Sequence, residues 1–136
     1  MRAVGAEIGY DEIFSCVGIW GGSDMTPLKI YLACPYSHTE VHVRLWRVLQ
    51  ADKKAAELMT AGNLVFSPLS HSHPISHHCE VDPCDNNFWL RQDLWILDIC
   101  DEMHILCLPG WAESKGIVIE IEHAKSKGIG IVYHEI

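Results

Sequence analysis

The sequence predicts a single-domain α/β protein in which a parallel sheet carries helices on both faces. Three observations support this fold class. The chain has 136 residues, enough for one buried core but too few for two domains. From Lys29 onward, short apolar runs alternate with segments of helical periodicity. The last apolar run follows a segment that is long enough for the crossover helix that parallel pairing requires.

Four apolar runs are the expected strands, at 30–34, 64–66, 103–108 and 129–133. Before the second run, Thr39 is expected to cap a long helix whose first turn carries Glu40, and Gly62 is expected to end it. A second helix is expected at 87–100. This succession is typical of Rossmann and flavodoxin-like sheets.

Two segments allow more than one interpretation. Residues 67–87 are predicted to form a long polar loop that contains three prolines, and loops of that length are often functional. Residues 117–127 contain β-branched side chains that favour a strand, but Gly116 and Gly128 frame a helix. We predict a helix there, because the run at 129–133 needs a crossover before it.

The beginning of the chain differs from the rest. Residues 1–24 are rich in glycine and show no sustained period, whereas residues 25–136 carry the strand and helix pattern. We therefore expect one folded domain at 25–136, preceded by an extension. The extension is open to three interpretations: an added segment, a start-site artefact or an arm that contacts a partner.

The net charge limits the expected binding partners, and the cysteine content limits the expected cellular compartment. A formal net charge of -8 disfavours polymeric nucleic acid, although helix-end amides can still hold one small anion. The six cysteines include no C-x-x-C pair, and several lie in apolar segments, which favours reduced, buried thiols. No apolar run approaches the ~20 residues of a membrane span, and no signal peptide is evident. A cytoplasmic protein without membrane contact is expected.

A turn after the run at 103–108 carries the first candidate site. Open parallel sheets bind ligands where a strand passes into a helix. Ser114 offers a hydroxyl group and Gly116 offers unhindered backbone N–H groups to an anion. Glu120 falls about one turn into the helix, where the helix dipole would keep a nucleophilic carboxylate ionised. Alternatively, Gly116 only permits the turn and Glu120 is solvated.

Asp93 is the second candidate. Trp89, Asp93 and Leu97 share one helical stripe, so the acid borders apolar surface. Burial there would raise its pKa and let it protonate a leaving group. The alternative is an aspartate at the rim that pairs with Arg91. Trp89 and Trp111 can each stack on a base or belong to the core.

Three motifs occur in the order found in a known superfamily: YLACPY at 31–36, DLWILDICD at 93–101 and SKGIVIE at 114–120. On these motifs the chain resembles the nucleoside 2-deoxyribosyltransferase-like superfamily over about residues 29–133. That group includes deoxyribosyltransferases and N-glycosidases that hydrolyse nucleoside monophosphates. The short segments C-P-Y-S, S-H-P-I and L-P-G-W are most similar to those of a bacterial and phage branch, domain of unknown function 1937.

The resemblance implies roles for the two acids. Glu120 matches the nucleophile that attacks the anomeric carbon, and Asp93 matches the acid that assists departure of the base. Two carboxyl groups that flank a glycosidic bond allow double displacement through an oxocarbenium-like transition state. Water would resolve the glycosyl ester in a hydrolase, and a second base would do so in a transferase. Hydrolysis is the favoured outcome.

The resemblance also implies a set of substrate-binding residues, in the first strand and its loop and in the turn that holds the 5′ side of the sugar: Tyr31, Cys34, Pro35, Tyr36, Ser114 and Gly116. A serine at 114 favours a 5′-monophosphate, because transferases that accept free nucleosides carry an acid there. Two features depart from the nucleotide hydrolases. The first loop lacks their glycine-serine-arginine pattern, and the insertion at 109–113 lengthens the approach to Ser114.

The histidine-rich segment 71–85 is the competing site. Its His, Cys and Asp residues are metal-ligand types, but their spacing matches no established zinc pattern and Pro74 interrupts the run. In the resembling branch this segment faces the pocket, so His71 or His73 is expected to bind a base or phosphate, with a polar surface loop as the alternative. We assign no metal ligand and no cofactor.

The leading hypothesis from the sequence is an enzyme that cleaves the N-glycosidic bond of a nucleoside or nucleoside 5′-monophosphate. One alternative is a non-catalytic module that binds or senses a nucleotide. Another is a metal-dependent hydrolase centred on 71–84. Relatives complete their pockets with a neighbouring subunit, so the resemblance also implies a homo-oligomer, either a dimer or a tetramer.

Overall fold

The computed structural model describes residues 26–136, and the expected extension at 1–24 lies outside them. This part of the chain contains one fully parallel sheet of four strands in the order β2-β1-β3-β4. The strands are β1 (Lys29–Ala33), β2 (Leu64–Phe66), β3 (Glu102–Leu106) and β4 (Gly130–His134). The helices are α2 (Val41–Thr60), α3 (Pro68–Ser76), α4 (Asn86–Asp98) and α5 (Lys115–Ser126), with a short 3-10 helix η1 (Trp111–Glu113). The predicted α/β fold is confirmed.

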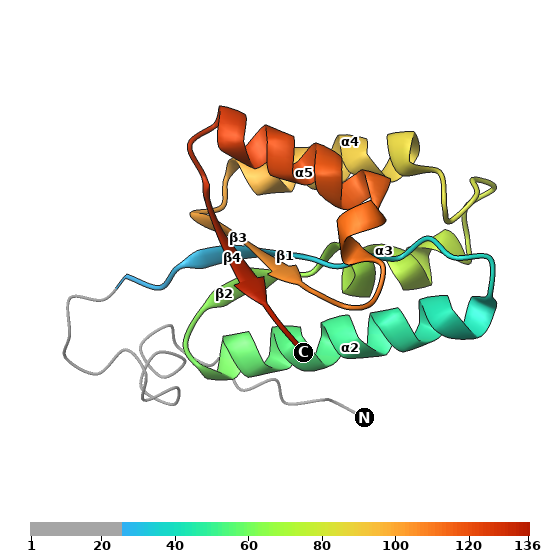
Figure 1. Ribbon diagram of the computed structural model, residues 1–136, viewed down its shortest axis with the longest axis horizontal. Helices are drawn as coiled ribbons and strands as arrows, with labels where there is room; N and C mark the ends of the chain where they lie inside the picture. Colours follow the sequence, from blue (N-terminus) through green and yellow to red (C-terminus); the bar gives the residue numbers. More distant parts are fainter. Residues whose placement is uncertain (1–25) are drawn as a thin grey trace, which may run out of the picture.

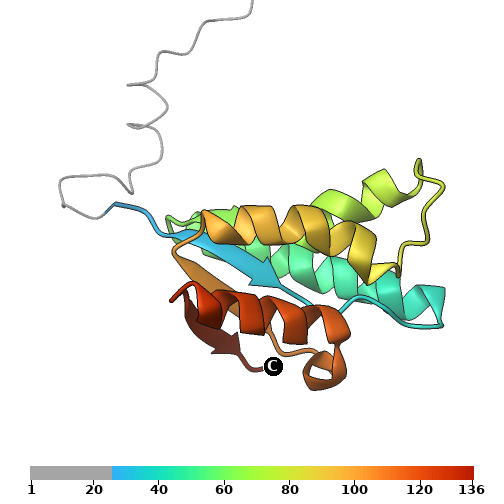
Figure 2. The same ribbon diagram turned by 90° about the horizontal axis from the view of Figure 1, so that it is seen from above.

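Helices cover both faces of the sheet, as expected (Figures 1 and 2). Because side chains alternate along a strand, Tyr31 and Met103 point to the face covered by α4 and α5. Leu32 and Leu106 point to the opposite face, where they pack with Ala51 of α2. The two resulting cores are apolar and almost free of exposed surface. They hold the sheet between two layers of helices.

The order of the strands creates a crevice at one edge of the sheet. From β1 the chain passes through α2 to β2 on one side, and then through α3 and α4 to β3 on the other side. The connections that follow β1 and β3 therefore diverge in opposite directions. In open parallel sheets a ligand binds at this point, outside the carboxyl ends of the strands.

Side-chain caps and glycines set several helix ends. Ser114 caps α5, where its hydroxyl oxygen accepts a hydrogen bond from the Ile117 backbone N–H. Asp85 caps α4 in the same way. Gly62 and Gly128 adopt positive φ angles of 102° and 71° just after α2 and α5, a conformation that glycine adopts without a Cβ clash. The predicted helix at 117–127 and its terminal glycine are confirmed.

Two local predictions were wrong. The segment 67–87 is not one continuous loop, because α3 occupies Pro68–Ser76. Ser67 caps that helix and Pro68 stands at its first position, where a missing N–H removes no helical hydrogen bond. Thr39 does not cap α2; Glu40 holds that position without a side-chain cap, and its own N–H donates to Nδ1 of His38 at 3.0 Å.

Two further expectations concern the thiol groups and the absence of membrane-spanning helices in residues 26–136. All five cysteines among residues 26–136 are free thiols: Cys34 and Cys107 are buried, and the other three are partly exposed. The expected reduced thiols are therefore present in this part of the chain. Within the same range no helix has the length and apolar character needed to cross a membrane.

Leu97 gives a direct test of the core. It is fully buried on α4 against the sheet, so we expect Leu97→Ala to lower the free energy of unfolding by about 2–5 kcal/mol through lost burial and a residual cavity. Urea denaturation followed by circular dichroism measures the change. Trp95, on the same helix but 65% exposed, provides the control: Trp95→Ala should change stability by less than about 1 kcal/mol. Equal effects would contradict this packing.

Candidate active site

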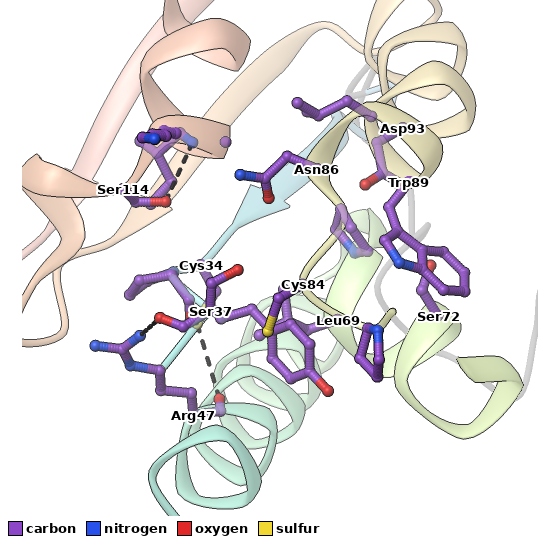
Figure 3. A pocket seen from close by; sticks show the side chains of 18 of the residues that line it. Cys34, Ser37, Arg47, Leu69, Ser72, Cys84, Asn86, Trp89, Asp93 and Ser114 are labelled. Carbon is purple, nitrogen blue, oxygen red and sulfur yellow. Dashed lines mark hydrogen bonds between the residues drawn. The ribbon is translucent and has the colours of Figure 1, made fainter. Parts of the chain in front are cut away.

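A cavity of about 480 Å³ opens at the crevice predicted by the strand order. Its walls come from the β1–α2 loop, α3, the first half of α4 and the connection from β3 into α5. Arg47 of α2 adds one further side chain. Figure 3 shows side chains from these separate elements directed at one shared space. Residues far apart in the sequence thus form a single concave site.

Both predicted acids line this cavity. Asp93 lies on the buried stripe of α4 and Glu120 on the buried stripe of α5, and these two helices pack side by side. Only 8% of Asp93 and 7% of Glu120 is exposed. The sequence predicted Asp93 on a helical stripe and Glu120 about one turn into the next helix, and the structure brings both side chains to one cavity.

Asp93 is buried without a compensating partner. Its Oδ1 atom has no hydrogen-bond partner, and no arginine or lysine among residues 26–136 forms an ion pair with it, so the alternative pairing with Arg91 is absent. Burial alone raises the pKa of Asp93 from 3.8 to about 7. At neutral pH this carboxyl group is therefore partly protonated and can donate a proton.

Glu120 does not behave as the helix dipole predicts. Its pKa is raised from 4.5 to about 8, mainly by burial; the Tyr31 hydroxyl group acts in the opposite direction, and the neighbouring charge of Asp93 adds a smaller increase. The prediction of an ionised Glu120 was wrong for a physical reason. The dipole acts mainly within the first helical turn, which Glu120 has passed, while desolvation acts on the whole buried group.

Tyr31 lies behind Glu120 and does not line the cavity. It is completely buried in the middle of β1, and burial raises the pKa of its hydroxyl group. That hydroxyl group lies next to the Glu120 carboxyl group, and no hydrogen bond is closed in this conformation. Tyr31 is thus placed to donate to Glu120 when the carboxylate ionises, but a ligand does not reach it directly.

Three polar side chains surround the open face of Gly116. A Cβ atom at this glycine would lie 3.8 Å from Asn86 Oδ1, 3.9 Å from Glu120 Oε1 and 3.9 Å from Ser114 Oγ. Ser114 and Gly116 thus lie where the sequence predicted, beside Glu120. Sequence reasoning missed Asn86. The available signal was its position directly after the α4 cap Asp85, because ligands often bind at the start of a helix.

Arg47 is the second residue that the sequence did not reveal. Its Nη1 donates to the Ser37 carbonyl oxygen at 3.0 Å, and its Nη2 donates to the Pro109 carbonyl oxygen at 2.9 Å. The guanidinium group therefore connects the loops that follow β1 and β3. Gly110 allows this approach, because its φ is +91° and a Cβ there would lie 3.0 Å from Arg47 Nη2.

The first loop contributes Cys34, Pro35 and Tyr36 to the cavity, as the resemblance implied. Burial raises the pKa of Cys34 to about 12, so it remains a thiol and is no nucleophile at neutral pH. The Tyr36 hydroxyl group shares a hydrogen bond of 2.8 Å with His73 Nδ1 from α3. Burial and the neighbouring His77 lower the pKa of His73, which favours its neutral form.

The two histidine candidates are separated. His73 lines the cavity, whereas His71 packs its ring against Phe66, with 5.4 Å between ring centroids, and lines a different surface depression between α3 and α4. The structure therefore does not bring His71 to the acids. Between residues 26 and 136 no three His, Cys, Asp or Glu side chains gather as a metal site, so the segment 71–84 offers no such centre.

The two tryptophans also differ. Trp89 lines the cavity near Asp93, where a ligand can reach it (Figure 3). Trp111 packs against the core, with its ring centroid 5.6 Å from that of Tyr133. Of these two candidates, Trp89 is thus the one that lines the cavity and can stack on a bound base.

Comparison with solved structures defines the class of this fold. The chain is similar to the 2-deoxyribosyltransferase of Bacillus psychrosaccharolyticus, with a TM-score of 0.53 and 23% identity over 79% of this chain and 75% of that one. It has a nucleoside 2-deoxyribosyltransferase-like fold. The chain belongs to the family described as Domain of unknown function (DUF1937), whose family model matches residues 28–136. No curated protein matches the sequence.

The buried acids should make stability depend on pH. Their folded-state pKa values lie above the unfolded values, so their contribution is present in acid and is lost as pH rises through about 7 and 8. We expect the stability gain of Asp93→Asn and Glu120→Gln over the wild type to be smallest near pH 4 and to grow by roughly 1–4 kcal/mol up to pH 9.

Urea denaturation of each variant at pH 4, 7 and 9 measures this gain. Glu122→Gln is the matched control, because Glu122 is exposed on the same helix and stays in water in both states. It should change stability little at any of the three pH values. A gain for Glu120→Gln that does not grow with pH would show that Glu120 is not desolvated.

Proposed function

We propose that this protein cleaves the N-glycosidic bond of a nucleoside or nucleoside 5′-monophosphate. The observation that carries the proposal is the pair Asp93 and Glu120, two buried carboxyl groups that line one cavity. Glycosidic bond cleavage uses such a pair. The fold shared with a 2-deoxyribosyltransferase and the match of both acids to the superfamily motifs support the same reaction.

The surroundings of the acids support a division of roles. In the free protein the pKa of Glu120, about 8, lies above that of Asp93, about 7, so the order of ionisation in the free pair does not assign the roles. When Glu120 ionises to attack, its anion needs a hydrogen-bond donor, since a buried anion without a donor is costly. Glu120 has the Tyr31 hydroxyl group beside it, whereas Oδ1 of Asp93 has no partner. Glu120 is therefore the nucleophile and Asp93 the acid.

The reaction proceeds in two steps. In the first, a Glu120 carboxylate oxygen forms a bond to C1′ of the sugar as the bond from C1′ to the base nitrogen breaks, and Asp93 gives its proton to the departing base. In the second, Asp93 takes a proton from water, which attacks C1′ and releases the sugar from Glu120. A second base in place of water would give transfer instead.

The cavity is suited to a ligand of this size. Its volume of about 480 Å³ lies within the range of small-molecule sites. Trp89 beside Asp93 is placed to stack on the leaving base, and Tyr36 with His73 offers hydrogen-bonding groups on the adjoining wall. Asn86 and Ser114 offer polar groups to the sugar.

We further propose a dimer or tetramer. Val41, Leu45 and Leu49 form an apolar stripe along α2, each about half exposed, and Trp46 adjoins it. Exposed apolar side chains that recur along one helix are typical of an interaction surface between protein chains.

Chromatography of free bases tests the reaction. The purified protein is incubated with a panel of ribo- and deoxyribonucleosides and their 5′-monophosphates. We expect the wild type to release a base from at least one of them. Because each variant removes one half of the pair, Glu120→Gln should lower the rate at least roughly 10³-fold and Asp93→Asn roughly 10²–10⁴-fold.

The exposed acid Glu122 supplies the control here too, and Glu122→Gln should keep the wild-type rate within about twofold, since it changes a charge on the same helix outside the cavity. Unimpaired base release by Glu120→Gln would refute its role as nucleophile. Nucleotide binding by the wild type with no base released from any compound would instead support a non-catalytic module.

A further inference from the structure

A second depression lies next to the active-site cavity, between α3 and α4. It measures about 710 Å³, and most of its lining is apolar. Ile75 of α3 and Phe88 and Trp95 of α4 line it, and these side chains are 42%, 46% and 65% exposed. Large apolar side chains that gather at a concave surface are typical of a binding site.

The depression and the cavity share part of their walls. Ser72 of α3 and Trp89 of α4 line both. In Figure 3 these two side chains lie toward the end of the cavity that holds Asp93, whereas Ser114 and Arg47 lie toward the opposite end. The depression therefore adjoins the cavity at the end where the proposed acid lies.

The indole ring of Trp89, at the boundary between the two, is held by two contacts. Its Nε1 atom donates to the Asp82 carbonyl oxygen at 3.2 Å, and the Phe88 ring lies edge-on to it, with 4.8 Å between the ring centroids. A ring that is already held binds an aromatic group with little further loss of side-chain entropy. Trp89 can thus contact a base in the cavity and an attached group in the depression.

The polar side chains of the depression favour an uncharged occupant. Gln92 Nε2 and His71 Nδ1 share a hydrogen bond of 3.5 Å between α4 and α3. Arg91 is exposed, so water solvates its charge. The depression therefore offers apolar contact area in the first place, and burial of an apolar group against Phe88 and Trp95 is its main source of binding energy.

A base bound for cleavage extends toward this depression. In the proposed reaction C1′ lies beside Glu120, and the base lies toward Asp93 and Trp89. Adenine and cytosine carry their exocyclic amino groups on a ring edge far from the glycosidic nitrogen. A substituent on such an amino group would pass Trp89 and enter the depression.

We propose that the depression holds an apolar substituent of the leaving base, so that the preferred substrates carry an alkyl or aryl group on the exocyclic nitrogen of the base. The inference rests on the proposed function and narrows its substrate class. Trp95 distinguishes substituted from parent bases, because it lines the depression but not the cavity.

Isothermal titration calorimetry of Glu120→Gln, which binds without turnover, tests the assignment. N6-benzyladenosine is compared with adenosine, and N4-benzylcytidine with cytidine. Burial of the phenyl ring should strengthen binding roughly tenfold in at least one pair. Trp95→Ala, introduced into the same protein, should reduce this gain at least about threefold, because it removes one wall of the depression.

Ile99→Ala is the matched control. Ile99 directly follows α4, is 55% exposed, and lines neither the cavity nor the depression. It should leave the gain from the benzyl group unchanged within about twofold. Equal affinity for the benzyl and parent compounds in both pairs would overturn the assignment, and so would a gain that persists in full in Trp95→Ala.

A second copy of the chain is the other candidate occupant. The apolar stripe proposed above as the oligomer contact lies on α2, on the opposite face of the sheet from α4. Analytical ultracentrifugation of Trp95→Ala decides between the two. Weakened self-association in this variant, together with no gain from the benzyl group in the parent protein, would make the depression a subunit contact and refute the inference.

Failure of the proposed function is distinguishable from failure of this inference, because the calorimetric comparison needs no cleavage. Base release without any benzyl preference would leave glycosidic cleavage standing and refute the inference. A gain that depends on Trp95, with no base released from any compound, would retain the binding site and refute the reaction. In an active wild type, a preference in binding that is absent from kcat/KM would overturn the substrate class.

Discussion

Desolvation of two carboxyl groups is the constraint on which the rest of this site depends. Asp93 and Glu120 are removed from water by the packing of α4 against α5 and by the sheet behind them. Burial opposes ionisation of both groups and is the largest cause of the raised pKa of each. A pair of acids that together hold a proton near neutrality can supply an acid and a nucleophile at the same time.

The buried polar atoms that lack a hydrogen-bond partner are concentrated at the cavity with the two acids. In the part of the chain that the structure describes, three buried side-chain polar atoms have no hydrogen-bond partner: Oδ1 of Asp93, the hydroxyl group of Tyr31 and Nε of Arg47. Asp93 and Arg47 line the cavity, and Tyr31 lies directly behind Glu120. No other buried side-chain nitrogen or oxygen atom of residues 26–136 lacks a hydrogen-bond partner. Such local departures from the rules of stable packing mark functional sites, where a ligand completes the missing contacts.

The sequence predicted the strands, the long helices and both acids, because each rests on a local signal. Leu97 and Asp93 fall on one stripe of α4, and the glycines that flank α5 mark its ends. Helix α3 was missed because its prolines were interpreted as loop signals, although one of them stands at the first helical position. Arg47 and Asn86 could not be predicted, since their roles depend on which loops tertiary packing brings together. The ionisation of Glu120 depended on its burial, which the sequence does not report.

A ¹³C NMR titration of the aspartate and glutamate carboxyl carbons in the free protein tests the central claim most directly. Asp93→Asn and Glu120→Gln spectra assign the two signals. The account predicts that the Asp93 resonance titrates with a midpoint near 7 and the Glu120 resonance near 8, and that replacing Asp93 lowers the Glu120 midpoint. Two independent midpoints near the ordinary values of about 4 would contradict it, because the carboxyl groups would then be solvated and separate.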